Sequence, residues 1–499
     1  MQTPPKPAIA NAKPVRSCES LATMALPNTT IESAAIDPAN PNVCRVQAFT
    51  THPPSGDRVR VWVAIPTSNW NGRFMGTGGG GFSGGSAGGV NQPVASGFAA
   101  GATDTGHEGA SGSFALKAGR LDWQSIRNNA HVGIHEMTVT GKALTQALYG
   151  VAPKFSYFNG CSTGGRQALT AAQRYPDDFD GIVANAPWVD QTGFTVGAMW
   201  NQKAMAQAPV TPAKMVLVAQ KVMEKCDALD GLKDGLVDDP RVCQFDAARD
   251  VPACAAGADG ADCLTASQAA TINAVYSGPK SKGKPFMSGF MPGSEAVNTA
   301  ANGTTQSGWV GAIVPAQPGA KPADFNLAEG VMKYLILDPP KADYDAMTFD
   351  YDKDTALVAR WSKLADAKDA DLSKFKKSGG KLIMTYGWAD QILQPMMGVK
   401  YYEAVTAKHG KSTTDFARLF MVPGMAHCQG GVGPDQNDAV SAVIDWVEKN
   451  KAPDSLLASR IVKGAVIRSR PLCPYPQVAR YKGQGSIDEA ANFSCVAPR

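Results

Sequence analysis

The sequence predicts an α/β fold in which helices cover a largely parallel sheet. Short β-prone runs at 154–158 and 180–187 flank a helix-compatible run at 166–174, and this alternation is typical of parallel sheets. The same alternation returns between residues 381 and 448. At 499 residues the chain exceeds the size of one ordinary compact core. We therefore expect two domains, or one domain with a large insertion.

Hydrophobic periodicity places the individual elements. The predicted strands are 58–65, 73–76, 97–102, 154–158, 180–187, 381–386 and 416–422. The predicted helices are 121–149, 166–174 and 438–448. Strand patterns become rare between these two groups of elements, which predicts a separate domain in the middle of the chain.

This pattern divides the chain into four segments. Residues 1–16 are rich in Pro and Ala and are expected to be poorly ordered. Residues 17–189 form the first part of the α/β core, and residues 371–499 form the second. Residues 190–370 are expected to be a lid domain inserted between them.

Composition excludes several classes of protein. The net charge of +4 is small for this length, so neither nucleic acid nor a membrane surface is expected as a partner. No apolar run reaches the roughly 18 residues of a membrane span. The ten cysteines are even in number and show no Cys-x-x-Cys pairs, which disfavours zinc and suits five disulfides in an oxidising compartment. We expect a mature secreted or periplasmic protein; the sequence does not indicate its oligomeric state.

A Gly-x-Ser-x-Gly pattern at Gly160, Ser162 and Gly164 lies between the predicted strand and helix. Small residues permit a sharp strand-to-helix turn that lifts the Ser hydroxyl out at the edge of a sheet. The N-terminus of the following helix favours negative charge developing on a substrate. The pattern predicts a nucleophile elbow, although a chain with 51 glycines also produces chance matches.

A glycine-rich stretch at 76–85 follows the predicted strand at 73–76. Its backbone N–H groups could build a phosphate cradle or an oxyanion hole, and a flexible surface loop is the alternative. No Gly-Lys-Ser/Thr follows, and the spacing is not that of a dinucleotide-binding turn. We therefore expect no organic cofactor.

An acid and a histidine follow the last two predicted strands. Asp390 comes after 381–386, and His427 comes after 416–422. Of the six histidines, only His409 and His427 lie beyond Asp390, and only His427 follows a strand. The order Ser162, Asp390, His427 is that of the α/β-hydrolase triad. The sequence thus predicts an α/β-hydrolase fold with a large inserted lid domain.

Two cysteines adjoin this triad. Cys161 precedes the Ser, and Cys428 follows the His, so convergence of the triad would bring their sulfurs within bridging range. The other cysteines are expected to pair with their neighbours in sequence. These pairs are Cys18–Cys44, Cys226–Cys243, Cys254–Cys263 and Cys473–Cys495.

An acidic loop lies early in the predicted lid. Asp227, Asp230 and Asp234 alternate with glycines, and hard oxygen ligands on a tight loop suit Ca²⁺. The twelfth-position glutamate of an EF-hand is missing. From these residues alone, a calcium site and a solvated acidic turn are equally good interpretations.

Taken together, these motifs resemble the tannase/feruloyl esterase family, which includes the mono(2-hydroxyethyl) terephthalate hydrolases. The resemblance covers nearly the whole chain and rests most specifically on the Cys-Ser, Asp and His-Cys arrangement. Its motifs are Trp70-Asn-Gly-Arg73 with the glycine-rich loop, Asp104-Thr-Gly-His107, Gly160-Cys-Ser-Thr-Gly-Gly165, Asp390 and His427-Cys428.

The resemblance implies roles for further residues. An oxyanion hole would use the N–H of Thr163 and that of Gly80 or Gly81. Asp104 and His107 are interpreted as structural supports. One structural Ca²⁺ would be held in the lid by the acidic loop. Its implied ligands are Asp227, Asp230 and Asp234, with the backbone carbonyls of Leu232 and Leu236.

The function expected from these residues is that of a serine carboxylesterase acting on small esters of aromatic, phenolic acids. Trp309 and Leu393 are candidate substrate contacts, although Trp309 could equally be a core residue. Residues 308–341 contain no arginine, which disfavours the charged terephthalate half-ester as substrate; a half-ester hydrolase is the alternative. An arginine from elsewhere, such as Arg360, could still reach the site. A serine peptidase and a non-catalytic binding module are remote alternatives.

Overall fold

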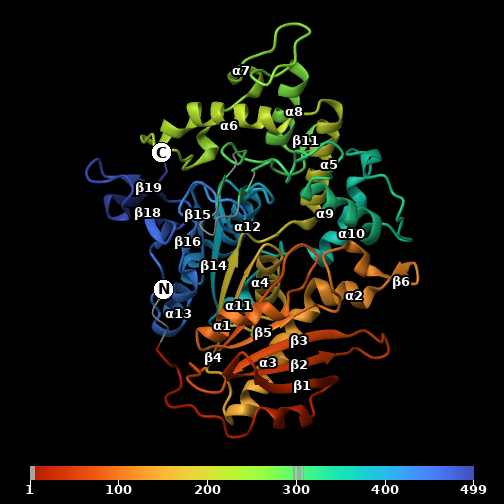
Figure 1. The fold of residues 1–499 in the computed structure, drawn as a ribbon, viewed down its shortest axis with the longest axis vertical. Helices are drawn as coiled ribbons and strands as arrows, with labels where there is room; N and C mark the ends of the chain where they lie inside the picture. Colours follow the sequence, from red (N-terminus) through yellow and green to blue (C-terminus); the bar gives the residue numbers. More distant parts are fainter. Residues whose placement is uncertain (1–5, 296–297, 300–304, 307, 499) are drawn as a thin grey trace.

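The computed structural model describes residues 6–295, 298–299, 305–306 and 308–498. A nine-stranded sheet crosses the molecule in the order β1-β2-β3-β5-β4-β8-β9-β14-β15 (Figure 1). The strands from β5 to β15 are parallel, and β1, β2 and β3 form an antiparallel edge. The strands are β1 (Thr29–Asp37), β2 (Asn40–Thr50), β3 (Val59–Pro66), β4 (Arg73–Thr77), β5 (Ala99–Thr103), β8 (Phe155–Cys161), β9 (Gly181–Asn185), β14 (Lys381–Gly387) and β15 (Ala417–Val422). The predicted α/β class is confirmed.

The seven predicted strands correspond to β3, β4, β5, β8, β9, β14 and β15, whereas β1 and β2 were not predicted. The predicted helix over 121–149 is divided into α2 (Trp123–Arg127), a π-helical turn η4 (Asn128–Val132) and α3 (Gly133–Tyr149). At this turn the side chains of Asn128 and Asn129 are buried. Asn128 Nδ2 donates to Asp57, and Asn129 Nδ2 donates to the Phe82 carbonyl.

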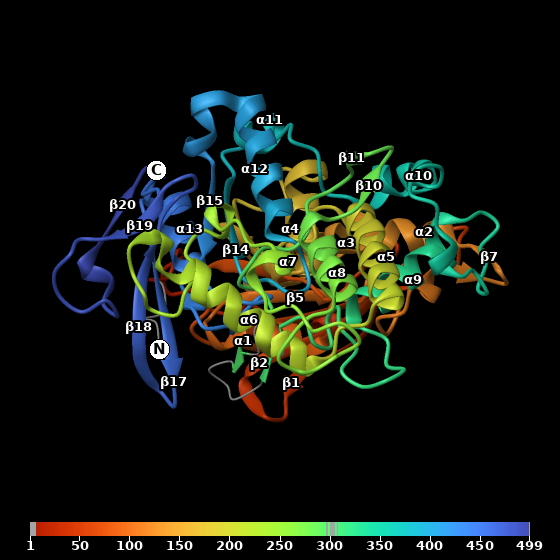
Figure 2. The same ribbon diagram turned by 90° about the horizontal axis from the view of Figure 1, so that it is seen from above.

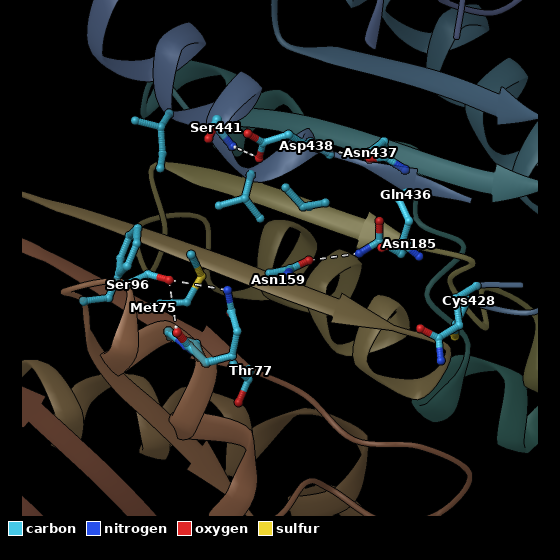
Figure 3. A pocket seen from close by; sticks show the side chains of 18 of the residues that line it. Met75, Thr77, Ser96, Asn159, Asn185, Cys428, Gln436, Asn437, Asp438 and Ser441 are labelled. Atoms are coloured by element: carbon cyan, nitrogen blue, oxygen red, sulfur yellow. Dashed lines mark hydrogen bonds between the residues drawn. The ribbon is translucent and has the colours of Figure 1, made fainter. Parts of the chain in front are cut away.

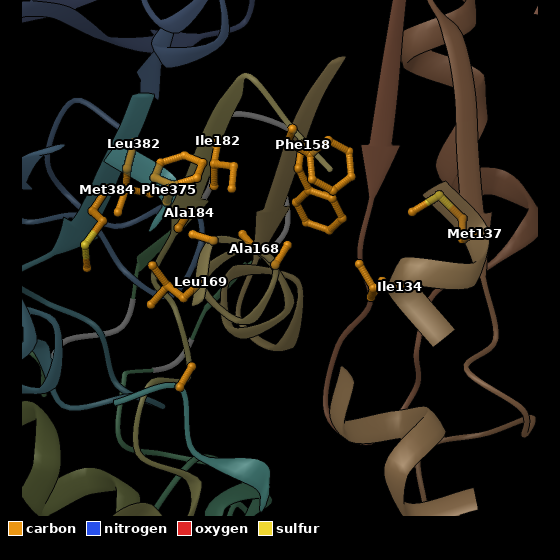
Figure 4. Packing of buried hydrophobic residues seen from close by; sticks show 14 of the residues in the cluster. Ile134, Met137, Phe158, Ala168, Leu169, Ile182, Ala184, Phe375, Leu382 and Met384 are labelled. Atoms are coloured by element: carbon orange, nitrogen blue, oxygen red, sulfur yellow. The ribbon is translucent and has the colours of Figure 1, made fainter. Parts of the chain in front are cut away.

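Alternate residues of the parallel strands enter two separate cores, as expected for a sheet that is buried on both faces. Phe158, Ile182 and Leu382 pack on one face, where Figure 4 shows them with α3 and α4 side chains. Tyr157 and Val183 point to the other face. The helices of the first face are α3, α4 (Thr163–Arg174), α11 (Ser373–Lys377) and α12 (Pro395–His409), and those of the second are α1 (Asn91–Ala95) and α13 (Ala439–Lys449).

The regular elements of the segment predicted as a lid are mostly helices, and they lie beyond one end of the central strands (Figures 1 and 2). Its helices are α5 (Gln191–Gln207), α6 (Pro212–Cys226), α7 (Ala247–Asp250), α8 (Ala266–Ser277), α9 (Ala323–Val331) and α10 (Thr355–Ala365). One apolar cluster lies almost entirely within the segment. A second cluster includes Phe82, Ala115 and Ile126 from the α/β core. The insertion is therefore packed against the core through this shared cluster, and its residues Phe194 and Met287 also enter the main core cluster beneath the sheet.

Residues 6–16 differ from the expectation of poor order. The Ala8 N–H donates to the Asn71 carbonyl at 2.8 Å, and the Val15 N–H donates to the Leu148 carbonyl at 2.8 Å. The Arg73 guanidinium also donates to the Lys6 carbonyl at 2.9 Å. These contacts hold the segment against the sheet although its composition is that of a linker. Residues 1–5 of the same prediction lie outside the described residues.

All five predicted disulfides are present: Cys18–Cys44, Cys161–Cys428, Cys226–Cys243, Cys254–Cys263 and Cys473–Cys495. The last of them ties together a C-terminal region that the sequence analysis left without elements. Its strands are β16 (Gln436–Asn437), β17 (Leu456–Val462), β18 (Ala465–Leu472), β19 (Val478–Tyr481) and β20 (Phe493–Val496). Within the described part of the chain, no helix has the length and hydropathy needed to span a membrane.

The packing of α3 on the sheet yields a stability prediction. A Cβ added at Gly141 of α3 would lie 2.6 Å from the buried Phe74 ring on β4. Gly141→Ala should therefore destabilise the protein by about 1–3 kcal/mol, although alanine normally favours a helix interior. Urea unfolding measures this effect. Gly88→Ala is the control, because its Cβ would approach no atom closer than 3.8 Å. A Gly141 variant as stable as the control would contradict the packing.

Candidate active site

Ser162 occupies a strained turn between β8 and α4. Its φ of 61° and ψ of −120° lie in a region that residues other than glycine rarely adopt. The turn is held by its backbone: the Ser162 N–H donates to the Asn185 carbonyl at 3.1 Å, and the Ser162 carbonyl accepts from Trp188 N–H at 3.0 Å. The geometry is that of the predicted nucleophile elbow.

Backbone segments meet at this turn without side chains between them. A Cβ on Gly160 would lie 2.6 Å from the carbonyl group of Gly164, and a Cβ on Gly78 would lie 2.4 Å from the Gly164 Cα. The Gly164 N–H donates to the Gly79 carbonyl at 2.8 Å. The glycine-rich loop and the first turn of α4 are therefore in direct contact.

Asp390 and His427 form the pair that the sequence predicts. Asp390 Oδ2 lies 2.8 Å from His427 Nδ1. Asp390 Oδ1 accepts from the N–H groups of Ile392 and Leu393 at 2.9 and 2.8 Å, and the carboxyl is fully buried. The His427 N–H donates to Gln391 Oε1 at 3.1 Å. The contact of Gln391 with the histidine loop was not predicted. In the sequence, only the position of Gln391 next to Asp390 could have indicated it.

The Cys161–Cys428 disulfide brings the elbow and the histidine loop together. The Cα atoms of the two cysteines are 5.9 Å apart, although the residues are separated by 267 positions. Each cysteine adjoins one candidate catalytic residue, Ser162 or His427. The bond therefore fixes the spacing of the two loops on which a nucleophile and its base would lie.

The glycine-rich loop presents N–H groups beside Ser162. The Thr163 hydroxyl donates to the Gly81 carbonyl, and the Gly79 N–H donates to Gln167 Oε1 at 3.1 Å. Among the described residues, no hydrogen bond engages the N–H of Gly80, Gly81 or Thr163. These are the three groups that the resemblance assigns to an oxyanion hole, and they remain candidates for it.

His107 and Asn129 support this loop from behind. His107 Nε2 lies 2.8 Å from the Phe82 carbonyl, which also accepts from Asn129 Nδ2 at 2.9 Å. The His107 ring stacks on Phe114, and burial lowers the pKa of His107. The Asp104 carboxyl accepts from the N–H groups of Arg60 and Gly106, and burial raises the pKa of Asp104 to about 6.

The side chains of the two candidate substrate contacts are both buried. Trp309 is 0% exposed, its ring packs on Tyr276 and Phe290, and its indole N–H donates to Ser294. The stacking role is therefore corrected to the core alternative. The Leu393 side chain is also buried in the core, and the contribution of this residue is the backbone N–H given to Asp390.

A residue of the insertion that was not predicted does lie beside the glycine-rich loop. A Cβ placed on Gly81 would be 3.5 Å from Leu327 Cδ2, which belongs to α9. Leu327 packs against the apolar cluster that joins the insertion to the core. The hydrophobic pattern marks Leu327 only as an apolar residue of a helix. Nothing in the sequence indicates that it lies beside the glycine-rich loop.

A further carboxylate of the acidic loop, Asp238, lies beside those of Asp230 and Asp234. Burial, followed by the charges of Asp230 and Asp234, raises the pKa of Asp238 well above its usual value, and burial also raises that of Asp230. Asp234 is paired with Arg470 of β18 at 2.5 Å. The Asp227 carboxylate accepts from the N–H groups of Asp234 and Gly235, both at 3.0 Å.

As they are placed, the described residues include no group of three His, Cys, Asp or Glu side chains spaced for a metal ion. The donor chemistry is nevertheless that of a hard cation, because the loop offers oxygen ligands and its carboxylates repel one another. Leu232 and Leu236 donate their N–H groups to Asp230 and Asp234 at 2.9 and 3.2 Å, which folds the loop around these side chains.

Known proteins resemble this chain over most of its length. A family model described as tannase and feruloyl esterase matches residues 42–496. A probable feruloyl esterase of Arthroderma benhamiae is 33% identical over 489 residues, covering 94% of this chain and 87% of the relative. The mono(2-hydroxyethyl) terephthalate hydrolase of Piscinibacter sakaiensis is 34% identical over 492 residues, covering 86% of this chain and 80% of the relative.

A solved structure agrees with these relatives. Feruloyl esterase B from Aspergillus oryzae superposes with a TM-score of 0.84 at 26% identity, covering 96% of this chain and 100% of that chain. The fold is thus of the α/β-hydrolase type, and the activity is that of a carboxylic ester hydrolase. The chain belongs to the tannase and feruloyl esterase family.

Proposed function

We propose that this carboxylic ester hydrolase acts on esters of neutral phenolic acids through a Ser162–His427–Asp390 acyl-enzyme mechanism. The observation that carries the proposal is the Cys161–Cys428 disulfide, which holds the strained Ser162 turn beside the loop of His427. A second observation supports the proposal: Asp390 Oδ2 lies 2.8 Å from His427 Nδ1, which is the acid–base pair that a triad requires.

Each residue then has one task. The Ser162 Oγ attacks the ester carbonyl while His427 Nε2 accepts its proton. Asp390 fixes the ring through Nδ1 and stabilises the imidazolium. The N–H of Thr163 and that of Gly80 or Gly81 hold the oxyanion. His427 returns the proton to the leaving alcohol, and water, activated by the same imidazole, cleaves the acyl-enzyme.

The histidine assignment can be tested with a matched pair. His427→Ala should lower kcat by several orders of magnitude, since loss of the nucleophile or base alone costs roughly a million-fold in such triads. His409→Ala is the control, because His409 ends α12 and its ring contacts the backbone of Leu372 and Ala370. Hydrolysis of 4-nitrophenyl acetate by folded protein gives the comparison, with Ser162→Ala expected to match His427→Ala. Retention of more than a few per cent of activity by either triad variant would reject the assignment.

The acyl preference rests on the cations near the insertion. Residues 308–341 contain no arginine. The Arg360 guanidinium, the candidate from elsewhere, is half-exposed, pairs with Asp338 at 3.5 Å and lies 5.1 Å from the centroid of the Trp123 ring. An ionised second carboxylate usually needs such a group free for bidentate binding. Leu327 beside Gly81 instead offers an apolar contact to an acyl ring.

A substrate panel tests this preference. We expect kcat/KM to be higher for methyl gallate or methyl ferulate than for mono(2-hydroxyethyl) terephthalate. The physical reason is that the charged half-ester loses hydration without gaining a cationic partner. A tenfold advantage for the half-ester, about 1.4 kcal/mol, would reverse the order and require a cationic anchor in the site.

We also propose that Ca²⁺ binds the acidic loop and stabilises the insertion. Asp227, Asp230 and Asp234 would supply carboxylate oxygens, with the carbonyls of Leu232 and Leu236. The ion would neutralise carboxylates that otherwise raise one another's pKa. Its contribution is structural, and no catalytic step depends on it.

Removal of the metal should lower thermal stability while the chemistry of the folded protein is unchanged. Ligand at a hundred times its Kd contributes about 2.7 kcal/mol, so chelation should lower Tm by several degrees. Asp230→Asn should remove most of this response, whereas Asp262→Asn, an exposed acid outside the loop, should keep it. An unchanged Tm together with no calcium by elemental analysis would contradict the site.

Export is part of the same proposal. Five disulfides without any free cysteine suit an oxidising compartment. We propose a secreted or periplasmic location on this basis.

A further inference from the structure

We propose that a second, non-catalytic site on this protein binds a neutral saccharide in a polar cavity behind the Cys161–Cys428 disulfide. The cavity has a volume of about 510 Å³, within the range of small-molecule sites. Figure 3 shows it at the ends of β8 and β9, next to the start of α13. It arises because α1 is only five residues long, so the sheet between α1 and α13 is left without a helix.

Hydrogen bonds between side chains of β14, β9 and β8 orient Asn159, one of the polar residues that line the cavity. Thr385 Oγ1 donates to Asn185 Oδ1 at 2.7 Å, and Asn185 Nδ2 donates to Asn159 Oδ1 at 2.9 Å. Because this series of hydrogen bonds begins at a hydroxyl donor, Asn159 Nδ2 is left as a donor without a partner among the described residues. The cavity wall thus presents an oriented amide N–H₂ group.

The loop before α13 supplies complementary groups. Asn437 Oδ1 accepts from the Ala439 N–H at 3.3 Å, and Gln436 Nε2 donates to Asp435 Oδ2 at 2.9 Å. In the described part of the chain, nothing pairs with Asn437 Nδ2 or Gln436 Oε1, nor with the side chain of Gln429. The cavity wall therefore presents both hydrogen-bond donors and hydrogen-bond acceptors. A saccharide hydroxyl both donates and accepts, so it matches such a wall.

The charge of the lining selects among ligands. The lining side chains include Asp435 and Asp438 but no Lys, Arg or His, so an anion would meet only negative charge. Each carboxylate is already engaged by protein donors: Asp435 accepts from the Gly430 N–H at 2.8 Å, and Asp438 accepts from the Ser441 N–H at 2.9 Å. Their remaining oxygens can accept from hydroxyl groups, and the other polar groups of the wall are neutral amides and hydroxyls, which match the hydroxyls of a neutral saccharide.

Apolar side chains complete the match. Met75, Phe98, Val183 and Ile444 line the same cavity and belong to the core on that face of the sheet. The C–H groups of a sugar ring can pack on such a surface while its hydroxyls reach the amides.

The cavity is separate from the candidate ester site and adjoins it. Cys428 lines the cavity and is bonded to Cys161, and Asn185 lines it while its carbonyl accepts from the Ser162 N–H. Bound saccharide would therefore lie across the disulfide from Ser162. Saccharide binding in this cavity does not depend on which ester the protein hydrolyses.

Isothermal titration of the full chain with cellobiose, xylobiose and maltose tests the site, with glucose, glucuronate and glucosamine as a charge series. We expect at least one neutral disaccharide to bind, and glucose to bind at least tenfold more tightly than glucuronate. Ser441→Phe should abolish binding by filling the cavity, and Ser441→Ala should retain it. Gln436→Ala, which removes an exposed amide, should weaken binding about tenfold without an effect on folding. Hydrolysis of 4-nitrophenyl acetate should be unchanged in all three variants.

Three results would overturn the proposal. They are binding of no neutral saccharide in the panel, preference for glucosamine or glucuronate over glucose, and undiminished binding by a folded Gln436→Ala or Ser441→Phe protein. Loss of ester hydrolysis together with binding would also count against it, because the two sites would then be one. If the triad variants described above retained esterase activity, the triad assignment would be rejected, but the saccharide-binding results would not change. The two proposals can therefore be tested separately.

Discussion

One covalent constraint organises the molecule: the disulfide between Cys161 and Cys428. It joins the end of β8 to the loop after β15, across the strand order β8-β9-β14-β15. The loop that it closes spans 267 positions and includes the whole insertion, for which the chain-entropy model gives about 5 kcal/mol of stabilisation. The bond also adjoins the strained turn of Ser162, which follows Cys161 directly.

Near the Cys161–Cys428 disulfide, the two faces of the sheet are packed differently. On the face of α3 and α4 the strands pack densely, and close approaches such as Gly78 to Gly164 leave no space for a side chain. On the opposite face the short α1 leaves strand-end amides uncovered beside α13. The same strand ends therefore contribute backbone to the elbow on one side and polar side chains to a cavity on the other.

The sequence was sufficient for features that are local or that a disulfide marks. The parallel strands, the elbow and all five pairs of cysteines were predictable, because periodicity and adjacency encode them. Strand β1 was not, since its exposed edge position gives no apolar alternation. The bond from Asp234 to Arg470 joins residues 236 positions apart, and the burial of Trp309 depends on partners from two other segments, Tyr276 of α8 and the loop of Phe290 and Ser294. Such contacts are set by tertiary packing, on which periodicity has no bearing.

The two apolar clusters of the insertion have a consequence for how chains of this kind can diverge. The cluster around Phe82 and Leu327 keeps α9 against Gly81, whereas the cluster around Trp309 lies almost wholly within the insertion. The second cluster does not contain Leu327, so changes within it do not act directly on the packing beside Gly81, although Ile392 of the Asp390 loop packs against it. Much of the outer part of the insertion can therefore diverge in sequence while the inner part keeps α9 against the glycine-rich loop.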